Sequence, residues 1–194
     1  MVRAAIIRPM KLKDDLVRHF QWLRQYGHND SHSGTASVRD ESSLWITPAE
    51  CCADALSSGD LVECLLDGEA SARAAADAPI HLAIYRANAN AGAILQSHGP
   101  YTIAMTLDSE EFIPATRRAE PSIGRVPVLT IPYERYSEQA PERLAEVLAR
   151  YPIAVVRGHG IYACANCAEQ AYRWTTALEL SAKTALIARQ AGKL

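Results

Sequence analysis

The chain lacks several features that mark large classes of protein. None of its hydrophobic runs approaches the length of about 20 residues that a membrane-spanning helix needs. It has no block of basic residues, and its formal net charge of -2 argues against nucleic acid as a partner. A short apolar patch near the N-terminus is not followed by a small-residue cleavage site, so we expect no signal peptide and no membrane association.

Cysteine is scarce and odd in number. Five cysteines in 194 residues do not suggest a disulfide framework, and a chain of this length can bury a core without one. We therefore expect reduced thiols and a cytoplasmic location. Hydrophobic residues make up 48% of the chain and charged residues 22%, as in ordinary soluble domains. Without an internal repeat or a linker, the sequence predicts one domain over residues 1–194.

Hydrophobic periodicity predicts helices and strands in mixed order. Apolar residues recur at helical spacing between Leu12 and Leu23, and Gly27 supplies a C-terminal stop. A polar stretch from His28 to Asp40 follows. Further helices are expected at 79–87, 141–150 and 168–190, and strands at 44–47, 61–65, 93–97, 126–131, 153–156 and 161–163. A mixed sheet flanked by helices is the architecture that this order favours.

Two strand ends carry the most informative side chains. The apolar segment from Ala91 to Leu107 is predicted to deliver Gln96 and His98 to one face, because alternate residues of a strand point the same way. A second apolar run ends on His159, which stands between two glycines. Histidines at two distant strand ends indicate a metal or acid/base site. Gln96 occupies the position at which a histidine would complete an H-x-H pair.

Short motifs follow one another in a recognisable order. They are Gly34–Arg39 (compare G-N-x-S-x-R), Leu44–Pro48, Asp77–His81 (compare E-x-x-x-H), Gln96–His98 (compare H-x-H), His159–Gly160 (a late H-G), and a long C-terminal helix with Glu179. In this order and spacing, the chain resembles the class II aldolase/adducin family. The resemblance covers nearly the whole chain.

The resemblance implies a three-layer α/β/α fold with a mixed, largely antiparallel central sheet. It also implies a homotetramer with active sites between subunits, a divalent zinc ion, and a metal-dependent aldehyde-lyase of carbohydrate metabolism. Carried over by position, Asp77 would be catalytic, His98, His159 and Gln96 would bind the metal, and Gly34, Thr35 and Thr47 would bind a small-molecule carbonyl substrate. The expected reaction is carbon–carbon cleavage of a small hydroxy-carbonyl compound.

The sequence departs from the family pattern at the metal site. Gln96 offers only a neutral amide oxygen, which is a weaker zinc donor than imidazole. Two histidines with Asp77 would also suit iron(II), so the identity of the metal stays open. Asp77 is one methylene shorter than glutamate, which places its carboxylate roughly 1.5 Å further back.

The phosphate-binding positions depart as well. Ala75 and Ala76 replace a pair of serines, and Glu50 stands where a glycine would let the backbone approach an anion. Alanine offers only backbone donors, and a carboxylate repels phosphate at close range. We therefore expect that these positions bind no phosphate or bind it weakly, which leaves room for an unphosphorylated substrate.

Other interpretations remain open. The combined changes at Gln96, Asp77, Ala75 and Ala76 are also consistent with an aldolase-fold protein that has lost catalytic activity and serves as an assembly or binding module. A metal-dependent dehydratase or oxygenase is a further alternative. Asp77 can also be interpreted as a helix N-cap. Cys164 and Cys167 form a C-x-x-C pair before a helix, so a redox role for them is a minor hypothesis.

Overall fold

The structure, a computed structural model, describes residues 2–116 and 123–193, with side chains from residue 11 onwards. Its centre is an eight-stranded sheet in the order β3-β2-β1-β4-β8-β7-β6-β5. The strands are β1 (Thr35–Asp40), β2 (Ser43–Ile46), β3 (Val62–Leu65), β4 (Ala93–Ser97), β5 (Glu111–Phe112), β6 (Val126–Leu129), β7 (Ile153–Val156) and β8 (Gly160–Ala165). Neighbouring strands are antiparallel except for the parallel pair β6–β7. The expected mixed, largely antiparallel sheet is confirmed.

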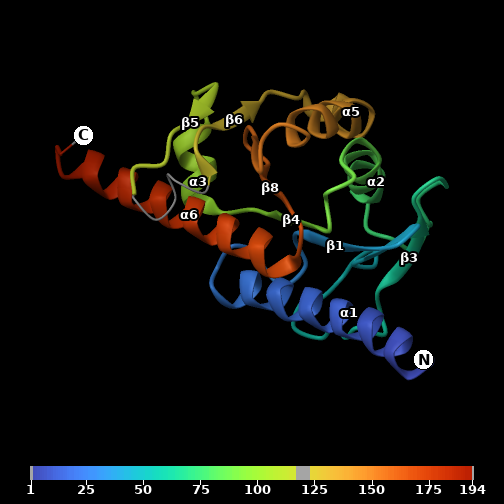
Figure 1. Cartoon of the computed structure of the whole chain (residues 1–194). Coiled ribbons are helices and arrows are strands. Elements are labelled where there is room, and N and C mark those ends of the chain that lie inside the picture. Colours follow the sequence, from blue (N-terminus) through green and yellow to red (C-terminus); the bar gives the residue numbers. More distant parts are fainter. Residues whose placement is uncertain (1, 117–122, 194) are drawn as a thin grey trace.

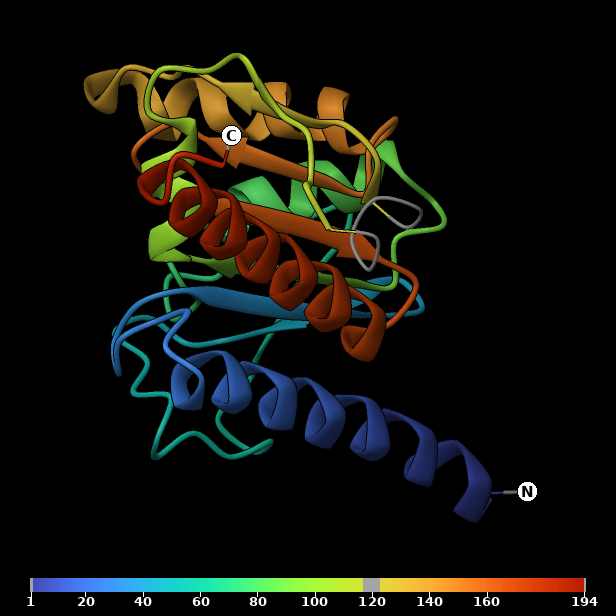
Figure 2. The ribbon, with the colours of Figure 1, turned by 90° about the vertical axis from the view of Figure 1, so that its left-hand side faces the viewer.

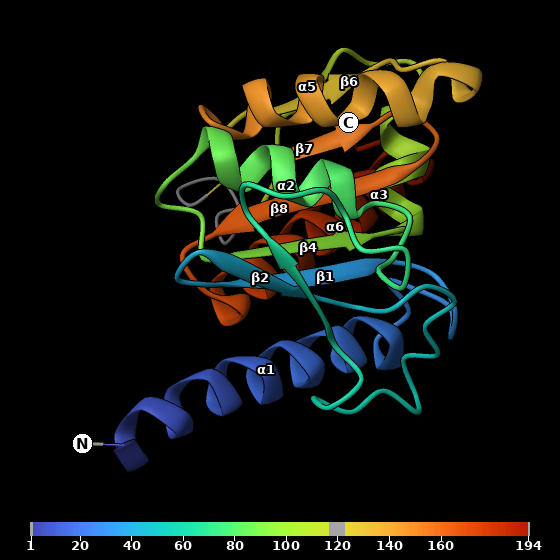
Figure 3. The same cartoon turned by 90° about the vertical axis from the view of Figure 1, so that its right-hand side faces the viewer.

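Helices cover both faces of this sheet. The helical segments are α1 (Val2–Gln25), α2 (Ala78–Ala87), α3 (Pro100–Thr106), the short 3-10 helix η1 (Tyr133–Arg135), α5 (Tyr136–Leu148) and α6 (Ala168–Gln190). Helices α2 and α5 pack together on one face (Figures 1 and 3). Helices α1 and α6 lie on the other face (Figure 2). The expected three-layer α/β/α architecture is therefore confirmed. No helix of the described residues has the length and hydropathy needed to cross a membrane.

The buried central strands contribute to two separate cores. Along β7, Ile153 and Val155 pack toward α1 and α6, whereas Ala154 and Val156 pack toward α2 and α5. The alternation follows from the two-residue period of a strand. Both faces are covered, so all four residues are apolar and buried.

The strand that carries Gln96 ends at Ser97, as expected, and is followed by a helix that was not expected, α3, which begins at Pro100. Proline has a fixed φ that suits the first helical position, and it disfavours strand pairing because it has no N–H group. Helix α5 begins at Tyr136, five residues before the expected start at Pro141. The polar stretch from His28 to Asp40 also contains β1, which lies near the middle of the sheet.

Three adjacent strands bring the candidate site together. Thr35 on β1 is paired with Gln96 on β4, and Gln96 is paired in turn with Tyr162 on β8. The end of β4 therefore lies beside the start of β1 and the start of β8. Residues that precede or follow these strand ends, including His98 and His159, therefore lie together at one end of the three central strands, which we call this edge of the sheet.

Candidate active site

A cavity of about 340 Å³ lies at this edge of the sheet. Its lining includes six of the seven residues that the sequence predicts to be functional: Gly34, Thr35, Asp77, Gln96, His98 and His159. The seventh, Thr47, does not line it. Thr47 is fully buried, and its hydroxyl oxygen accepts a hydrogen bond from the Ala36 N–H group at 3.3 Å.

Backbone contacts fix the position of His98. Its N–H group donates to the His28 carbonyl oxygen at 3.0 Å and to Asn29 Oδ1 at 2.9 Å. The side chains of Gln96 and His98 lie on one face, as the sequence predicts, with Gln96 Nε2 3.1 Å from His98 Nε2. An amide nitrogen carries only donors, so in this orientation His98 Nε2 accepts.

Gly160, the residue after His159, allows the start of β8 to lie close to the end of β4. A Cβ atom on Gly160 would overlap the Ser97 carbonyl oxygen, so only glycine permits this approach of β8 to β4. The imidazole rings of His98 and His159 lie nearly perpendicular, with their centroids 5.3 Å apart. The structure thus places two imidazoles from distant segments side by side.

Asp77 and His159 are joined by two tyrosines that the sequence analysis did not select. The Tyr162 hydroxyl donates to Asp77 Oδ2 at 2.6 Å. The Tyr136 hydroxyl contacts the Tyr162 hydroxyl and lies 3.0 Å from His159 Nε2. Asp77 stands at the N-cap position of α2, as the alternative interpretation predicts, but its side chain makes no capping hydrogen bond.

Of these two tyrosines, only Tyr162 could have been identified as a candidate from the sequence. It lies two residues beyond Gly160 on a buried strand, and a buried tyrosine normally requires a partner for its hydroxyl. Tyr136 lies at the start of α5, far from the motifs in sequence, and nothing in the pattern indicates it.

Burial controls the charge of the site. It is the main cause that lowers the pKa of both His98 and His159, while the Asp77 carboxylate opposes the shift at each. Burial also raises the pKa of Tyr136 and of Tyr162, so both hydroxyls keep their protons at neutral pH. Neutral imidazoles and protonated phenols are therefore the forms present near pH 7.

The family resemblance implies a divalent metal, and the donors present can be compared with what a metal needs. Within residues 2–116 and 123–193, no group of three His, Cys, Asp or Glu side chains is placed to hold a metal ion. Two imidazoles are adjacent, and a rotation of the Gln96 carboxamide would bring its oxygen to where its nitrogen now faces His98. Two imidazoles and an amide oxygen fit a zinc site weaker than three imidazoles would form.

The wall behind the cavity is a closed polar network. His81 is fully buried, and its two ring nitrogens contact the hydroxyls of Thr35 at 3.0 Å and Ser37 at 2.7 Å. The Ser37 hydroxyl also contacts the Tyr85 hydroxyl at 3.0 Å. The Thr35 hydroxyl is thus shared with His81, which limits what it can offer to a substrate.

Cys164 and Cys167 lie away from this cavity, at the other end of β8. All five cysteines are free. Burial raises the pKa of the Cys164 thiol to about 12, which makes it a poor nucleophile. These observations disfavour a redox role for the C-x-x-C pair.

Comparison with known proteins supports the resemblance. The sequence model of the family described as "Class II Aldolase and Adducin N-terminal domain" matches residues 14–186. A 3-oxo-tetronate 4-phosphate decarboxylase from Pectobacterium atrosepticum is 27% identical over 166 residues, which cover 81% of this chain and 75% of that protein. An L-fuculose phosphate aldolase from Methanocaldococcus jannaschii is 25% identical over 157 residues, covering 79% of this chain and 84% of that protein.

A solved structure has the same arrangement. The crystal structure of L-fuculose-1-phosphate aldolase from Thermus thermophilus aligns with a TM-score of 0.87 and 26% identity. The alignment covers 92% of this chain and 94% of that one. The similarity therefore extends over almost the entire fold, including the strands that carry the cavity.

Proposed function

Because the chain belongs to the class II aldolase and adducin family, we propose that it is a lyase that breaks a carbon–carbon bond next to a carbonyl group. The substrate is a small hydroxy-carbonyl compound. One observation carries this proposal: a carboxylate, Asp77, and two neutral imidazoles, His98 and His159, line one cavity together. Such a set can move protons and stabilise the negative charge that develops on the carbonyl oxygen.

Asp77 is the proposed acid/base. Its Oδ2 atom accepts the Tyr162 hydrogen bond, which fixes the orientation of the carboxylate. The Oδ1 atom then remains for the substrate hydroxyl. In cleavage, Asp77 takes the proton of the hydroxyl group whose carbon becomes the aldehyde. Tyr162 is a positioning residue, since its hydroxyl reaches Asp77 and Tyr136.

We propose that a divalent metal, zinc or iron(II), would be held by His98, His159 and the side-chain oxygen of Gln96. When bound, the metal supplies a Lewis acid for the negative charge that develops during cleavage. The residues themselves define the polarity of the cavity. His98 and His159 mark the side at which the carbonyl oxygen lies, and Asp77 marks the side of the hydroxyl that loses its proton.

We further propose that the substrate carries no phosphate. The Ala75 N–H group donates to the Thr47 carbonyl oxygen at 3.0 Å, and the Ala49 N–H group donates to the Arg73 carbonyl oxygen at 2.9 Å. These backbone donors are therefore not available to an anion. Glu50 lines the same cavity and adds a negative charge. The names of the relatives above are those of enzymes of phosphorylated sugars, so phosphate is the decisive comparison.

Decarboxylation is a second candidate, favoured by the similarity to several 3-oxo-tetronate 4-phosphate decarboxylases. Loss of CO₂ from a 3-oxo acid and retro-aldol cleavage both leave electrons on the carbon next to a carbonyl. The same stabilisation of an oxyanion therefore serves both reactions. The products distinguish them, since one releases CO₂ and the other an aldehyde.

The test is a product assay on matched substrates. Protein loaded with zinc is incubated with L-fuculose, L-fuculose 1-phosphate and an unphosphorylated 3-oxo acid, and the aldehyde and CO₂ released are both measured. We expect aldehyde from the unphosphorylated sugar at a rate at least equal to that from the phosphate. Asp77→Asn should abolish turnover, and Tyr162→Phe should lower kcat more than it changes KM.

Two controls separate the alternatives. Asp67→Asn removes a carboxylate that does not line the cavity and should leave turnover unchanged. Release of CO₂ alone would favour the decarboxylase. Preference for L-fuculose 1-phosphate would refute the proposal about phosphate. Failure to transform any of the three would favour the assembly or binding module.

A further inference from the structure

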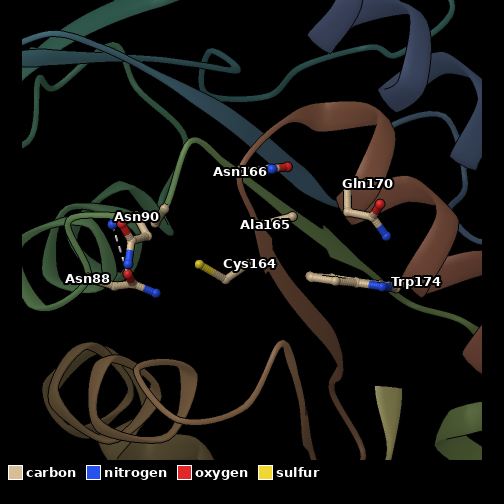
Figure 4. A pocket seen from close by; sticks show the side chains of 8 residues that line it. Asn88, Asn90, Cys164, Ala165, Asn166, Gln170 and Trp174 are labelled. Atoms are coloured by element: carbon tan, nitrogen blue, oxygen red, sulfur yellow. Dashed lines mark hydrogen bonds between the residues drawn. The ribbon is translucent and has the colours of Figure 1, made fainter. Parts of the chain in front are cut away.

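A second cavity lies at the opposite end of strands β4 and β8 from the candidate active site. Its volume is about 530 Å³. It is lined by the segment between α2 and β4, the end of β8 and the first turns of α6, as Figure 4 shows. The candidate active site adjoins the other ends of the same strands. The length of a five-residue strand, about 16 Å, therefore separates the two cavities.

The lining of this second cavity carries no formal charge. Four of its side chains are carboxamides: Asn88, Asn90, Asn166 and Gln170. Cys164 is the only titratable residue in the lining, and burial raises the pKa of its thiol to about 12. A charged ligand would find no side chain of opposite charge among the described residues that line this cavity. The chemistry of the lining therefore selects a neutral, polar ligand.

Three of these carboxamides are not engaged by the protein, and two of them, Asn90 and Asn166, are exposed to solvent. The Asn88 oxygen accepts a hydrogen bond from the Asn90 N–H group at 3.0 Å. The side-chain amides of Asn90, Asn166 and Gln170 make no hydrogen bond to any described residue. Each carboxamide both donates and accepts, as does a hydroxyl group. Several such groups around one space match a ligand that carries several hydroxyls.

An aromatic side chain completes the cavity. Figure 4 shows Gln170 and Trp174 on one side, Asn88 and Asn90 on the other, and Cys164 between them. Trp174 is half-buried and therefore offers part of its indole to the cavity. Indole packs against C–H groups through its apolar face and presents a polar N–H at its edge. A sugar ring or polyol chain presents both kinds of group.

We propose that this second cavity binds a neutral polyhydroxylated small molecule, a sugar or a polyol, independently of the candidate active site. No residue of its lining is shared with the site that contains Asp77, His98 and His159. The proposal therefore does not depend on the reaction proposed above.

Tryptophan fluorescence tests this directly. The chain has three tryptophans, so the Trp22→Phe, Trp45→Phe double variant keeps Trp174 as the single reporter. It is titrated with D-xylose, D-glucose and erythritol, and with D-glucose 6-phosphate for comparison. We expect a saturable change with at least one neutral compound and a weaker response to the phosphate. Ligand-observed NMR with the unsubstituted protein repeats the measurement without relying on the variants.

Matched amide variants locate the binding. Gln170→Ala and Asn166→Ala should each weaken binding about three- to tenfold, the loss expected for one hydrogen bond. Gln190→Ala removes a carboxamide at the other end of the same helix and should change nothing.

Three outcomes would overturn the proposal. One is a response that shows no saturation up to about 100 mM sugar, which would mean a Kd too weak for a specific site. The second is binding that survives both Gln170→Ala and Asn166→Ala. The third is Trp174 emission that changes with protein concentration and not with sugar, because this would show that a second copy of the chain fills the cavity.

Discussion

Gln96 is the residue whose identity most affects what the candidate active site can bind. It is almost fully buried, and its Nε2 atom lies 3.1 Å from His98 Nε2. A neutral amide oxygen is a poorer ligand for zinc than an imidazole nitrogen. In the proposed metal site, this single position would therefore determine how tightly a divalent ion is held.

Replacing Gln96 with histidine should strengthen metal binding. We expect Gln96→His to raise zinc affinity by about 10- to 100-fold or more, since even the loss of a residue that only orients a metal ligand has an effect of that size. Competition titration with a chromophoric chelator measures it. His98→Ala, made in the Gln96→His background, should remove the gain. Equal affinities of the unsubstituted protein and Gln96→His would place the metal site elsewhere.

His81 makes stability depend on pH through a residue that the proposed chemistry does not use. Burial lowers its pKa from 6.5 to about 4, and the Asp77 carboxylate opposes this only in part. Between these values the unfolded chain binds a proton that the folded chain does not. Stability therefore falls as pH decreases through this window, by about 3 kcal/mol in total for a shift of this size. The contribution is fully present above pH 6.5.

Urea denaturation between pH 7 and pH 4.5 tests the His81 prediction. His81→Gln retains a donor and an acceptor but does not titrate, so its free energy of unfolding should depend less steeply on pH than that of the unsubstituted protein. The remaining slope is expected to have the same sign, because burial also lowers the pKa of His28, His98 and His159. His32→Gln, at an exposed loop position, serves as the control. Identical slopes for His81→Gln and the unsubstituted protein would contradict the assignment.

At the scale of elements, helix α3 is held to α6 by one carboxylate. Glu179 accepts hydrogen bonds from the N–H groups of Tyr101 and Thr102, both at 2.9 Å, and from the Thr102 hydroxyl at 2.7 Å. These donors belong to the first turn of α3, where a negative charge is also favoured by the helix dipole. Because α3 begins two residues after His98, this contact also supports the loop that carries His98 in the candidate active site.

Removing that carboxylate should destabilise the protein strongly. Glu179→Ala leaves three donors unpaired in a buried place, and we expect a loss of about 3 kcal/mol or more in the free energy of unfolding. Glu179→Gln should lose less, since one oxygen can still accept. Glu169→Ala, on the exposed face of the same helix, removes a surface ion pair with Arg173 and should cost less than about 1 kcal/mol. Similar losses in Glu179→Ala and Glu169→Ala would show that α3 is not anchored this way.

At the scale of the molecule, the sequence predicts the apolar elements well and the polar contacts poorly. The last helix has the predicted bounds, Ala168–Gln190, and the strand at Ile153–Val156 does too, because both follow a clear hydrophobic period. Strand β1 escapes sequence prediction since its buried Ser37 is satisfied by His81 and Tyr85, which no local pattern reveals. The contact between Tyr136 and Tyr162 escapes it for the same reason: the fold alone makes them neighbours.

Exposed apolar side chains on helix α6 suggest that several copies of the chain assemble into an oligomer. Leu180 and Ile187 lie seven residues apart on α6, and each is 53% exposed, so one face of this helix carries apolar side chains outward. We expect a homo-oligomer, a tetramer, that covers such surface and completes the active site between subunits. Light scattering at micromolar concentration should give about four times the chain mass of 21.2 kDa. The Leu180→Arg, Ile187→Arg double variant should lower it, whereas Leu65→Arg, at an exposed site on the edge strand β3, should not. A chain that stays monomeric under these conditions would have to form its active site alone, and the interfacial arrangement would then be ruled out.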